Sequence, residues 1–150
     1  MTDLTTLHAE QGQSIWLDNL SRAMLRSGTL ADWIRDGVRG LTSNPTIFAK
    51  AIGGSDDYDD QFGELIATGL STEEAYWAMV VDDIRAACDE FRALYDSSDR
   101  TDGFVSVEVS PALSRDTGAT LDAARDLHAR VGRDNVMIKI PATVEGLDAI

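Results

Sequence analysis

A single lysine stands in an apolar run near the C-terminal end of the sequence. Lys139 lies within Val136–Ile140, where the other residues are all apolar, and the only other lysine of the chain is Lys50. An ammonium in a dry site loses solvation, which favours the neutral amine, and a neutral amine can attack a carbonyl, whereas a guanidinium cannot lose its proton. Lysines also end strands with the charged head in water. Lys139 is therefore a candidate for Schiff-base formation, with a solvated strand end as the alternative.

Polar residues also stand at the ends of the other apolar runs. Four runs have the length and composition of strands, and they cover Ser14–Leu20, Val38–Thr42, Phe104–Val109 and Val136–Ile140. At or near their C-terminal ends stand Asp18, Thr42-Ser43-Asn44, Glu108 and Lys139. In parallel barrels the C-terminal strand ends form one mouth. The sequence therefore predicts that two carboxylates, one amide and one amine converge on a single site.

Helical patterns separate the four strands, and this alternation is typical of a parallel sheet built from βα units. The predicted helices cover Ser21–Ser27, Thr29–Asp36, a segment starting at Pro45 behind an Asn44 cap, a short segment near Gln61–Ala67, a long one from Ser71 to about Tyr95, and Asp116–Val131. Between them, Gly53–Asp60 is interpreted as an acidic surface loop.

The number of βα units predicts the fold class. Four units are half of an eight-stranded barrel, and barrels typically need about 250 residues. The fold class is therefore predicted to be α/β, a (β/α)8 barrel of which this chain of 150 residues holds about the first four units. Residues 1–150 would then form the N-terminal half of one domain, with the remainder missing. A half-barrel exposes sheet edges and apolar lining residues.

Each candidate site residue has a structural alternative. Asp18 can cap a following helix, Asn44 can serve only as a helix cap, and Glu108 can be a solvated edge residue. Glu108, however, lies between Val107 and Val109, so a carboxylate interrupts an apolar strand. A buried acid needs a partner. A nearby amine and an ordered water would provide one and would also form a proton relay.

Composition excludes several classes of function. With 26 acidic and 13 basic residues the net charge is −13, which argues against a nucleic-acid backbone or an anionic membrane as partner, although a small anionic substrate responds to the local field of its pocket. The apolar runs are too short to span a bilayer and no signal-peptide pattern is present, so we expect a cytoplasmic protein.

Cys88, the only cysteine, is interpreted as a residue packed in the core. His8 and His128 match no metal-ligand spacing, so no metal is expected.

Two stretches resemble the signature stretches of the transaldolase family: Gly40-Leu-Thr-Ser-Asn-Pro-Thr-Ile-Phe48 and Val136-Met-Ile-Lys-Ile-Pro-Ala-Thr-Val-Glu-Gly-Leu-Asp-Ala-Ile150. Trp16–Arg22 and Val107–Ser110 resemble the first and third strand ends of that family. The match runs in the family's order from about Gln13 to Ile150 and is most like the longer, actinobacterial-type members. The resemblance implies a cofactor-independent class I aldolase barrel that moves a dihydroxyacetone unit between sugar phosphates in the pentose phosphate pathway.

The resemblance also implies a role for each candidate residue. Lys139 would form the Schiff base with the donor ketose, and Asp18 would take and return the proton on the hydroxyl at the cleaved carbon–carbon bond. Glu108 would act through a water during formation and hydrolysis of the imine. Asn44, with Thr42, would hold the hydroxyls of the dihydroxyacetone unit. These roles agree with covalent and general acid–base catalysis.

Family members continue through four more strands, which carry the arginine and serine that bind the substrate phosphate. Arg22 and Arg115 stand near strand ends here, without a motif that ties them to phosphate. Two alternatives to transaldolase are a fructose-6-phosphate aldolase-like enzyme, which cleaves rather than transfers, and an inactive truncated fragment. The resemblance implies that the compact aldolase-like relatives have a glutamine at the position of Glu108. The glutamate of this chain therefore favours transaldolase.

Overall fold

A four-stranded parallel sheet organises the chain. The computed structural model describes residues 4–150 and contains β1 (Trp16–Asp18), β2 (Gly40–Thr42), β3 (Phe104–Glu108) and β4 (Val136–Lys139), in the spatial order β1-β2-β3-β4. All three pairings are parallel. The predicted parallel sheet of βα units is confirmed. Each strand is shorter than its predicted run, although single backbone hydrogen bonds continue past the strand ends, as from the Val109 amide to the Lys139 carbonyl oxygen at 3.2 Å.

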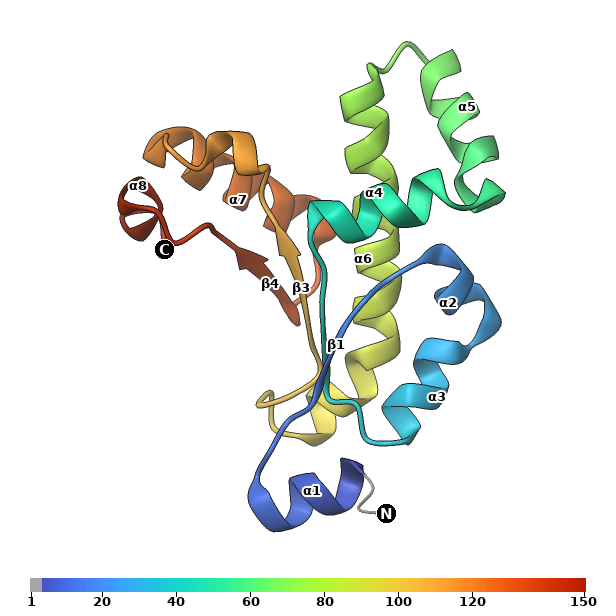
Figure 1. The fold of residues 1–150 in the computed structure, drawn as a ribbon, viewed down its shortest axis with the longest axis vertical. Coiled ribbons are helices and arrows are strands. Elements are labelled where there is room, and N and C mark those ends of the chain that lie inside the picture. Colours follow the sequence, from blue (N-terminus) through green and yellow to red (C-terminus); the bar gives the residue numbers. More distant parts are fainter. Residues whose placement is uncertain (1–3) are drawn as a thin grey trace.

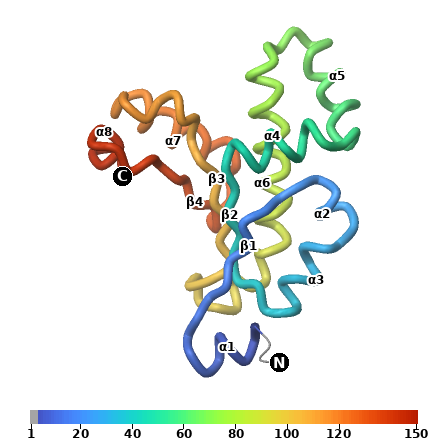
Figure 2. Tube along the Cα trace, viewed as in Figure 1, coloured from blue at the N-terminus to red at the C-terminus, as the bar shows by residue number. Residues whose placement is uncertain are grey.

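Helices precede, connect and follow the strands (Figures 1 and 2). They are α1 (Leu4–Gln11), α2 (Arg22–Ser27), α3 (Thr29–Arg35), α4 (Pro45–Gly53), η1 (Asp56–Tyr58), α5 (Asp59–Ala67), α6 (Thr72–Ser97), η2 (Pro111–Leu113), α7 (Thr117–Val131) and α8 (Val144–Leu147). α6 begins at a capping box, in which the Ser71 hydroxyl accepts from the Glu74 amide and the Glu74 carboxylate accepts from the Ser71 amide. α1, which was not predicted, lies at the N-terminal ends of the strands (Figure 1).

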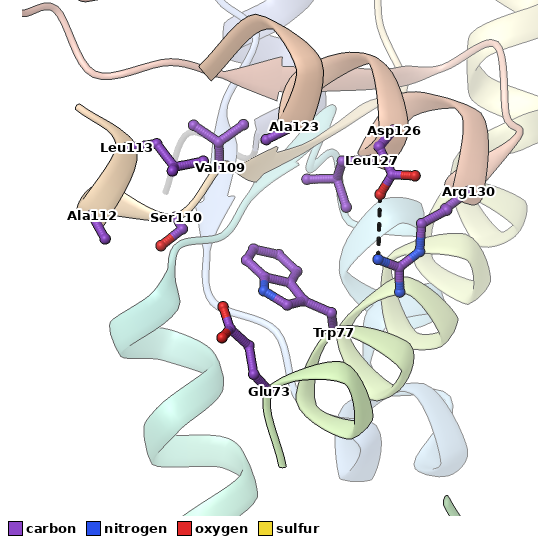
Figure 3. Close-up of a pocket in the computed structure, with 10 residues that line it drawn as sticks. All are labelled: Glu73, Trp77, Val109, Ser110, Ala112, Leu113, Ala123, Asp126, Leu127 and Arg130. Atoms are coloured by element: carbon purple, nitrogen blue, oxygen red, sulfur yellow. Dashed lines mark hydrogen bonds and ion pairs between the residues drawn. The ribbon is translucent and has the colours of Figure 1, made fainter. Parts of the chain in front are cut away.

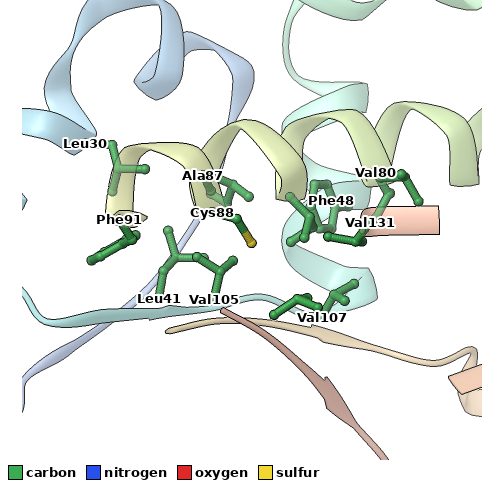
Figure 4. Packing of buried hydrophobic residues seen from close by; sticks show 14 of the residues in the cluster. Leu30, Leu41, Phe48, Val80, Ala87, Cys88, Phe91, Val105, Val107 and Val131 are labelled. Carbon is green, nitrogen blue, oxygen red and sulfur yellow. The ribbon is translucent and has the colours of Figure 1, made fainter. Parts of the chain in front are cut away.

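The hydrophobic core lies between one face of the sheet and α6 (Figure 4). Leu41, Val105 and Val107 are buried on the strands. The facing residues of α6 recur every three or four positions, as on one side of a helix; they are Val80, Ile84, Ala87, Cys88 and Phe91, each at most 1% exposed. Cys88 is a core residue as predicted, and burial raises the pKa of its thiol to about 12.

The prediction of an acidic surface loop at Gly53–Asp60 is wrong. The segment folds as the end of α4, η1 and the start of α5, and Tyr58 is 1% exposed. Its hydroxyl donates to Asp83 Oδ2 at 2.7 Å and accepts from the Arg22 amide at 2.9 Å, while Arg22 Nε donates to Asp83 Oδ1 at 3.0 Å. Desolvation raises the pKa of Asp83, and the bonds from Tyr58 and Arg22 oppose that rise. The aspartates correctly indicated surface positions, but one aromatic side chain anchors the segment to α6.

Asp83→Asn should destabilise the protein strongly. The guanidinium of Arg22 is buried, and removing the charged partner of a buried ion pair costs about 3–5 kcal/mol. The midpoint of thermal unfolding measures the effect. Asp89→Asn is the matched control, because Asp89 pairs with Arg133 at 2.6 Å with its own side chain 54% exposed, and exposed pairs contribute about 1 kcal/mol or less. Equal losses in the two variants would contradict a special role for the buried network.

The opposite face of the sheet is partly exposed. Met137 points to this face and is 42% exposed, and β1 and β4 are edge strands. Three apolar residues at the C-terminal end of the chain, Val144, Leu147 and Ile150, are also exposed. On the described part of the sheet, Met137 and the outer edges of β1 and β4 are thus uncovered. Within residues 4–150, none of the helices has the length and apolarity that a bilayer crossing requires.

Candidate active site

The C-terminal ends of the four strands meet at one edge of the sheet. In the strand register Asp18 is beside Thr42, Thr42 is beside Ser106, and Glu108 is beside Lys139. Side chains alternate along a strand, and directly paired residues of neighbouring strands share a face. These five polar residues therefore share one face, opposite the face that Leu41, Val105 and Val107 present to α6.

Three oxygens surround the Lys139 ammonium. Its Nζ donates to the Ser43 carbonyl oxygen at 2.8 Å and to Thr42 Oγ1 at 3.2 Å, and it lies 3.4 Å from Glu108 Oε2. The Lys139 side chain is 37% exposed. The expectation of a dry, apolar surrounding is therefore wrong in this structure. Its apolar neighbour Ile138 alternates to the core face and packs there, so neighbours in sequence do not shield the amine.

Glu108 contacts the Lys139 amine. This contact was predicted, because a carboxylate in an apolar strand needs a partner. It lies on β3, which has β2 on one side and β4 on the other, so the alternative of a solvated edge residue is not supported. Its neighbours Val107 and Val109 are buried, whereas its own side chain is 24% exposed. The carboxylate is therefore open to the hollow at the strand ends while pairing with Lys139.

Two serines connect the ends of β2 and β3 beneath the amine. Ser106 Oγ donates to Thr42 Oγ1 at 3.0 Å, and Ser43 Oγ donates to the Ser106 carbonyl oxygen at 2.8 Å. Both serines are buried, at 3% and 0% exposure. Sequence reasoning missed Ser106, although its position two residues before Glu108, on the same strand face, could have indicated it.

An open hollow of about 640 Å³ lies beside these strand ends, and Asp18, Asn44, Lys50 and Glu108 line it. Asn44 caps α4, because its Oδ1 accepts from the Ile47 amide at 3.0 Å. Its side-chain nitrogen has no partner among residues 4–150, so the cap and a ligand contact are compatible. The structure thus brings Asp18, Asn44 and Glu108 to one hollow, and the contacts of Glu108 with Lys139 extend the group to the amine.

Asp18 does not act as the predicted alternative, a helix cap. The cap of α2 is Ser21, whose hydroxyl accepts from the Met24 amide. The Asp18 side chain is exposed and makes no hydrogen bond or ion pair within the described part of the chain. An exposed carboxylate without a structural partner remains available for proton transfer.

Two other basic residues, Arg22 and Lys50, differ in whether their side chains are free to contact a ligand. Arg22 is buried and bonded to Asp83, with its guanidinium 4.2 Å from the Tyr58 ring centroid, so its surroundings do not favour a role in binding phosphate. Lys50 is exposed at the rim of the hollow, which the sequence reasoning had not predicted. Among residues 4–150, no three or more His, Cys, Asp or Glu side chains cluster as metal ligands would.

A second hollow lies outside the sheet, between α6, η2 and α7. Trp77 projects into it toward Val109 and Leu127, and the ion pair of Asp126 with Arg130, at 3.5 Å, borders it (Figure 3). This hollow contains none of the predicted site residues. The strand-end hollow therefore remains the candidate active site.

Comparison with known proteins identifies the family of the chain. A family model described as transaldolase/fructose-6-phosphate aldolase matches residues 15–150. Similar curated proteins are a transaldolase of Neisseria gonorrhoeae, 49% identical over 100% of this chain and 42% of its own length, and transaldolase 1 of Streptomyces coelicolor, 50% identical over 95% and 38%. A transaldolase of Thermobifida fusca is 52% identical over 95% of this chain and 39% of its own length. The chain thus spans about two fifths of the length of these relatives, and it belongs to the transaldolase/fructose-6-phosphate aldolase family.

Proposed function

We propose that this chain provides the Schiff-base part of a transaldolase active site. The reaction moves a dihydroxyacetone unit from a ketose phosphate, sedoheptulose 7-phosphate, to an aldose phosphate, glyceraldehyde 3-phosphate. The observation that carries the proposal is the Lys139 amine, held beside Glu108 at the edge of a parallel sheet where Asp18 and Asn44 also lie. Membership of the family and the names of the relatives support it.

The proposal includes a closed (β/α)8 barrel, of which residues 1–150 form the N-terminal half of a single domain. The edge strands β1 and β4 and the exposed Met137 support this, because closure would pair both edges and cover the inner face. Closure also curves the sheet. Curvature brings Asp18 on β1 toward Lys139 on β4, as a shared substrate requires.

The three oxygens around Nζ determine which proton the amine loses. An ammonium has three N–H groups, of which two donate to the Ser43 carbonyl and the Thr42 hydroxyl, and the third oxygen near Nζ is Glu108 Oε2 at 3.4 Å. A carbonyl and a hydroxyl do not take a proton at neutral pH, so the N–H toward Glu108 is the one released, to the carboxylate or to a water on it. The lone pair then points to the Glu108 side of the hollow, where the C2 carbonyl of the donor would bind.

Covalent chemistry then follows in a balanced sequence. Nζ adds to C2 of the ketose, and Glu108, through a water, supplies the proton with which the C2 hydroxyl leaves as water. Asp18 takes the proton of the C4 hydroxyl, the C3–C4 bond breaks, and its electron pair moves to the iminium to give an enamine. The other fragment leaves as the aldehyde erythrose 4-phosphate, and glyceraldehyde 3-phosphate takes its place. The enamine attacks the aldehyde of this acceptor, and Asp18 returns its proton to the new hydroxyl. Water then hydrolyses the iminium, which releases the product ketose and regenerates the Lys139 amine. Asn44 and Thr42 hold the hydroxyls of the three-carbon unit.

The alternative is cleavage without transfer, as in fructose-6-phosphate aldolase. Glu108 favours transfer, because a carboxylate beside Lys139 fits the water-mediated proton steps, whereas the resemblance implies a glutamine at this position in the aldolase-like relatives. The similar curated proteins named above all carry the name transaldolase. Release of free dihydroxyacetone from fructose 6-phosphate without an acceptor would favour the alternative.

The proposal predicts activity only for a closed barrel. The completed barrel, defined as residues 1–150 joined to the remaining C-terminal part of one of these relatives, should form erythrose 4-phosphate from sedoheptulose 7-phosphate and glyceraldehyde 3-phosphate. Residues 1–150 alone should show no measurable activity in the same assay, because two sheet edges stay open. A completed barrel that folds but forms no erythrose 4-phosphate would contradict the function. Formation by residues 1–150 alone at a comparable rate would contradict the need for the second half.

A further inference from the structure

We propose that Ser106 is a positioning residue for the Lys139 amine, acting through Thr42 and through the backbone of Ser43. The inference rests on the proposed function, because it concerns the same amine. Ser106 itself does not contact Lys139 through its side chain. Instead it bonds to both residues that accept hydrogen bonds from Nζ.

The geometry forms a closed link between β2 and β3. Ser106 Oγ donates to Thr42 Oγ1 at 3.0 Å, and the Ser106 carbonyl oxygen accepts from Ser43 Oγ at 2.8 Å. Ser43 also donates its backbone amide to the same carbonyl oxygen at 3.1 Å. Three hydrogen bonds therefore fix the end of β2 against one residue of β3. The Ser43 carbonyl and the Thr42 hydroxyl, which hold Nζ, cannot move independently of Ser106.

The donor and acceptor count of Thr42 explains how a hydroxyl that does not touch the amine can affect it. A hydroxyl has two acceptor lone pairs and one hydrogen. Ser106 occupies one lone pair of Thr42 and the Lys139 ammonium occupies the other, so the Thr42 hydrogen points away from both donors. Without Ser106, the Thr42 hydroxyl can rotate and its lone pair no longer needs to face Nζ.

Burial makes this link stiff. Ser106 is 3% exposed and Ser43 is 0% exposed, so water does not readily replace the missing bond. Covalent attack on a carbonyl requires the reacting atoms to be held about 3–3.5 Å apart and aligned. A loosened amine therefore loses rate in the imine step, while the binding of an acceptor sugar, which occurs after that step, is unaffected.

The test uses Ser106→Ala in the completed barrel. We expect the rate constant for imine formation with fructose 6-phosphate, measured by borohydride trapping, to fall roughly three- to tenfold, the effect of losing one hydrogen bond. kcat should fall with it, whereas kcat/KM for glyceraldehyde 3-phosphate, which depends only on the steps after imine formation, should stay unchanged. Ser106→Thr keeps the hydroxyl and should restore the trapping rate. If Ser106→Ala does not fold, Ser106→Cys, which is close in size and a weak donor, should show the same split.

Thr120→Val is the matched control, because Thr120 is 1% exposed and its hydroxyl donates to the Leu113 carbonyl at 2.7 Å, away from the amine. It should lower thermal stability without changing the trapping rate. Wild-type trapping in Ser106→Ala, or in Ser106→Cys where that variant is needed, would overturn the positioning role and leave the proposed function intact. Absence of any adduct in the unchanged completed barrel would overturn the proposed function and this inference with it.

Discussion

Lys139→Met in the completed barrel should abolish both transaldolase activity and covalent capture of the donor. Treatment of the unchanged protein with borohydride and fructose 6-phosphate should fix a three-carbon adduct on Lys139, because the imine is reduced to a stable secondary amine. Methionine fills similar space but has no nucleophile, so turnover should fall by roughly a thousandfold or more, the scale of removing an essential nucleophile. Mass spectrometry of the trapped, digested protein locates the adduct.

Lys50→Met is the matched control, since Lys50 is the only other lysine and lines the same hollow. Its loss should leave the adduct in place. An adduct on Lys50, or none on either lysine in an active protein, would refute the assignment of Lys139. The circular dichroism of Lys139→Met should match that of the unchanged protein. A match shows that the loss of turnover comes from the missing amine and not from unfolding.

Asp18→Asn should separate imine formation from carbon–carbon bond cleavage. The amide has the shape of the carboxylate but cannot take the proton of the C4 hydroxyl, so turnover should fall by roughly a hundredfold or more. Borohydride trapping with fructose 6-phosphate should persist, because the role proposed for Asp18 follows the attack of Lys139. Steady-state kinetics and trapping on the same preparation measure the two effects.

The structure predicts little loss of stability in Asp18→Asn, because Ser21 caps α2 and Asp18 has no side-chain partner in the described part of the chain. Asp122→Asn, at another exposed aspartate, is the control for removal of one negative charge. If Asp18→Asn melted at a lower temperature but kept its turnover, Asp18 would be a structural residue. Loss of trapping together with turnover would place Asp18 in the imine step instead.

Much of the site could be predicted from sequence because local patterns carry it. Apolar runs separated by capped helices indicated a parallel sheet, and in such a sheet all strands end at one edge. The placement of Asp18, Asn44, Glu108 and Lys139 at that edge followed from this, and the pairing of Glu108 with Lys139 followed from the need of a carboxylate in an apolar strand for a partner.

Other features depended on contacts that no local pattern records. The hydrogen bond from Lys139 Nζ to Thr42 joins residues 97 positions apart, and the hydrogen bond from Ser106 to Thr42 joins residues 64 positions apart. Both depend on the register between strands, since a shift of one residue would turn each side chain to the other face. The burial of Tyr58 likewise depends on a distant contact, because its partner Asp83 lies on α6.

The sequence by itself determined the kind of sheet, the order of its units, the helix caps and the residue types at the strand ends, because period, capping and turn chemistry act over a few neighbouring positions. Only the tertiary structure decided how Lys139 is held. Its neighbours in sequence are apolar, yet alternation sends Ile138 to the core face, and oxygens from β2 and β3 surround the amine instead. The environment of a side chain in a sheet is set by its neighbours across strands, which register selects and sequence adjacency does not.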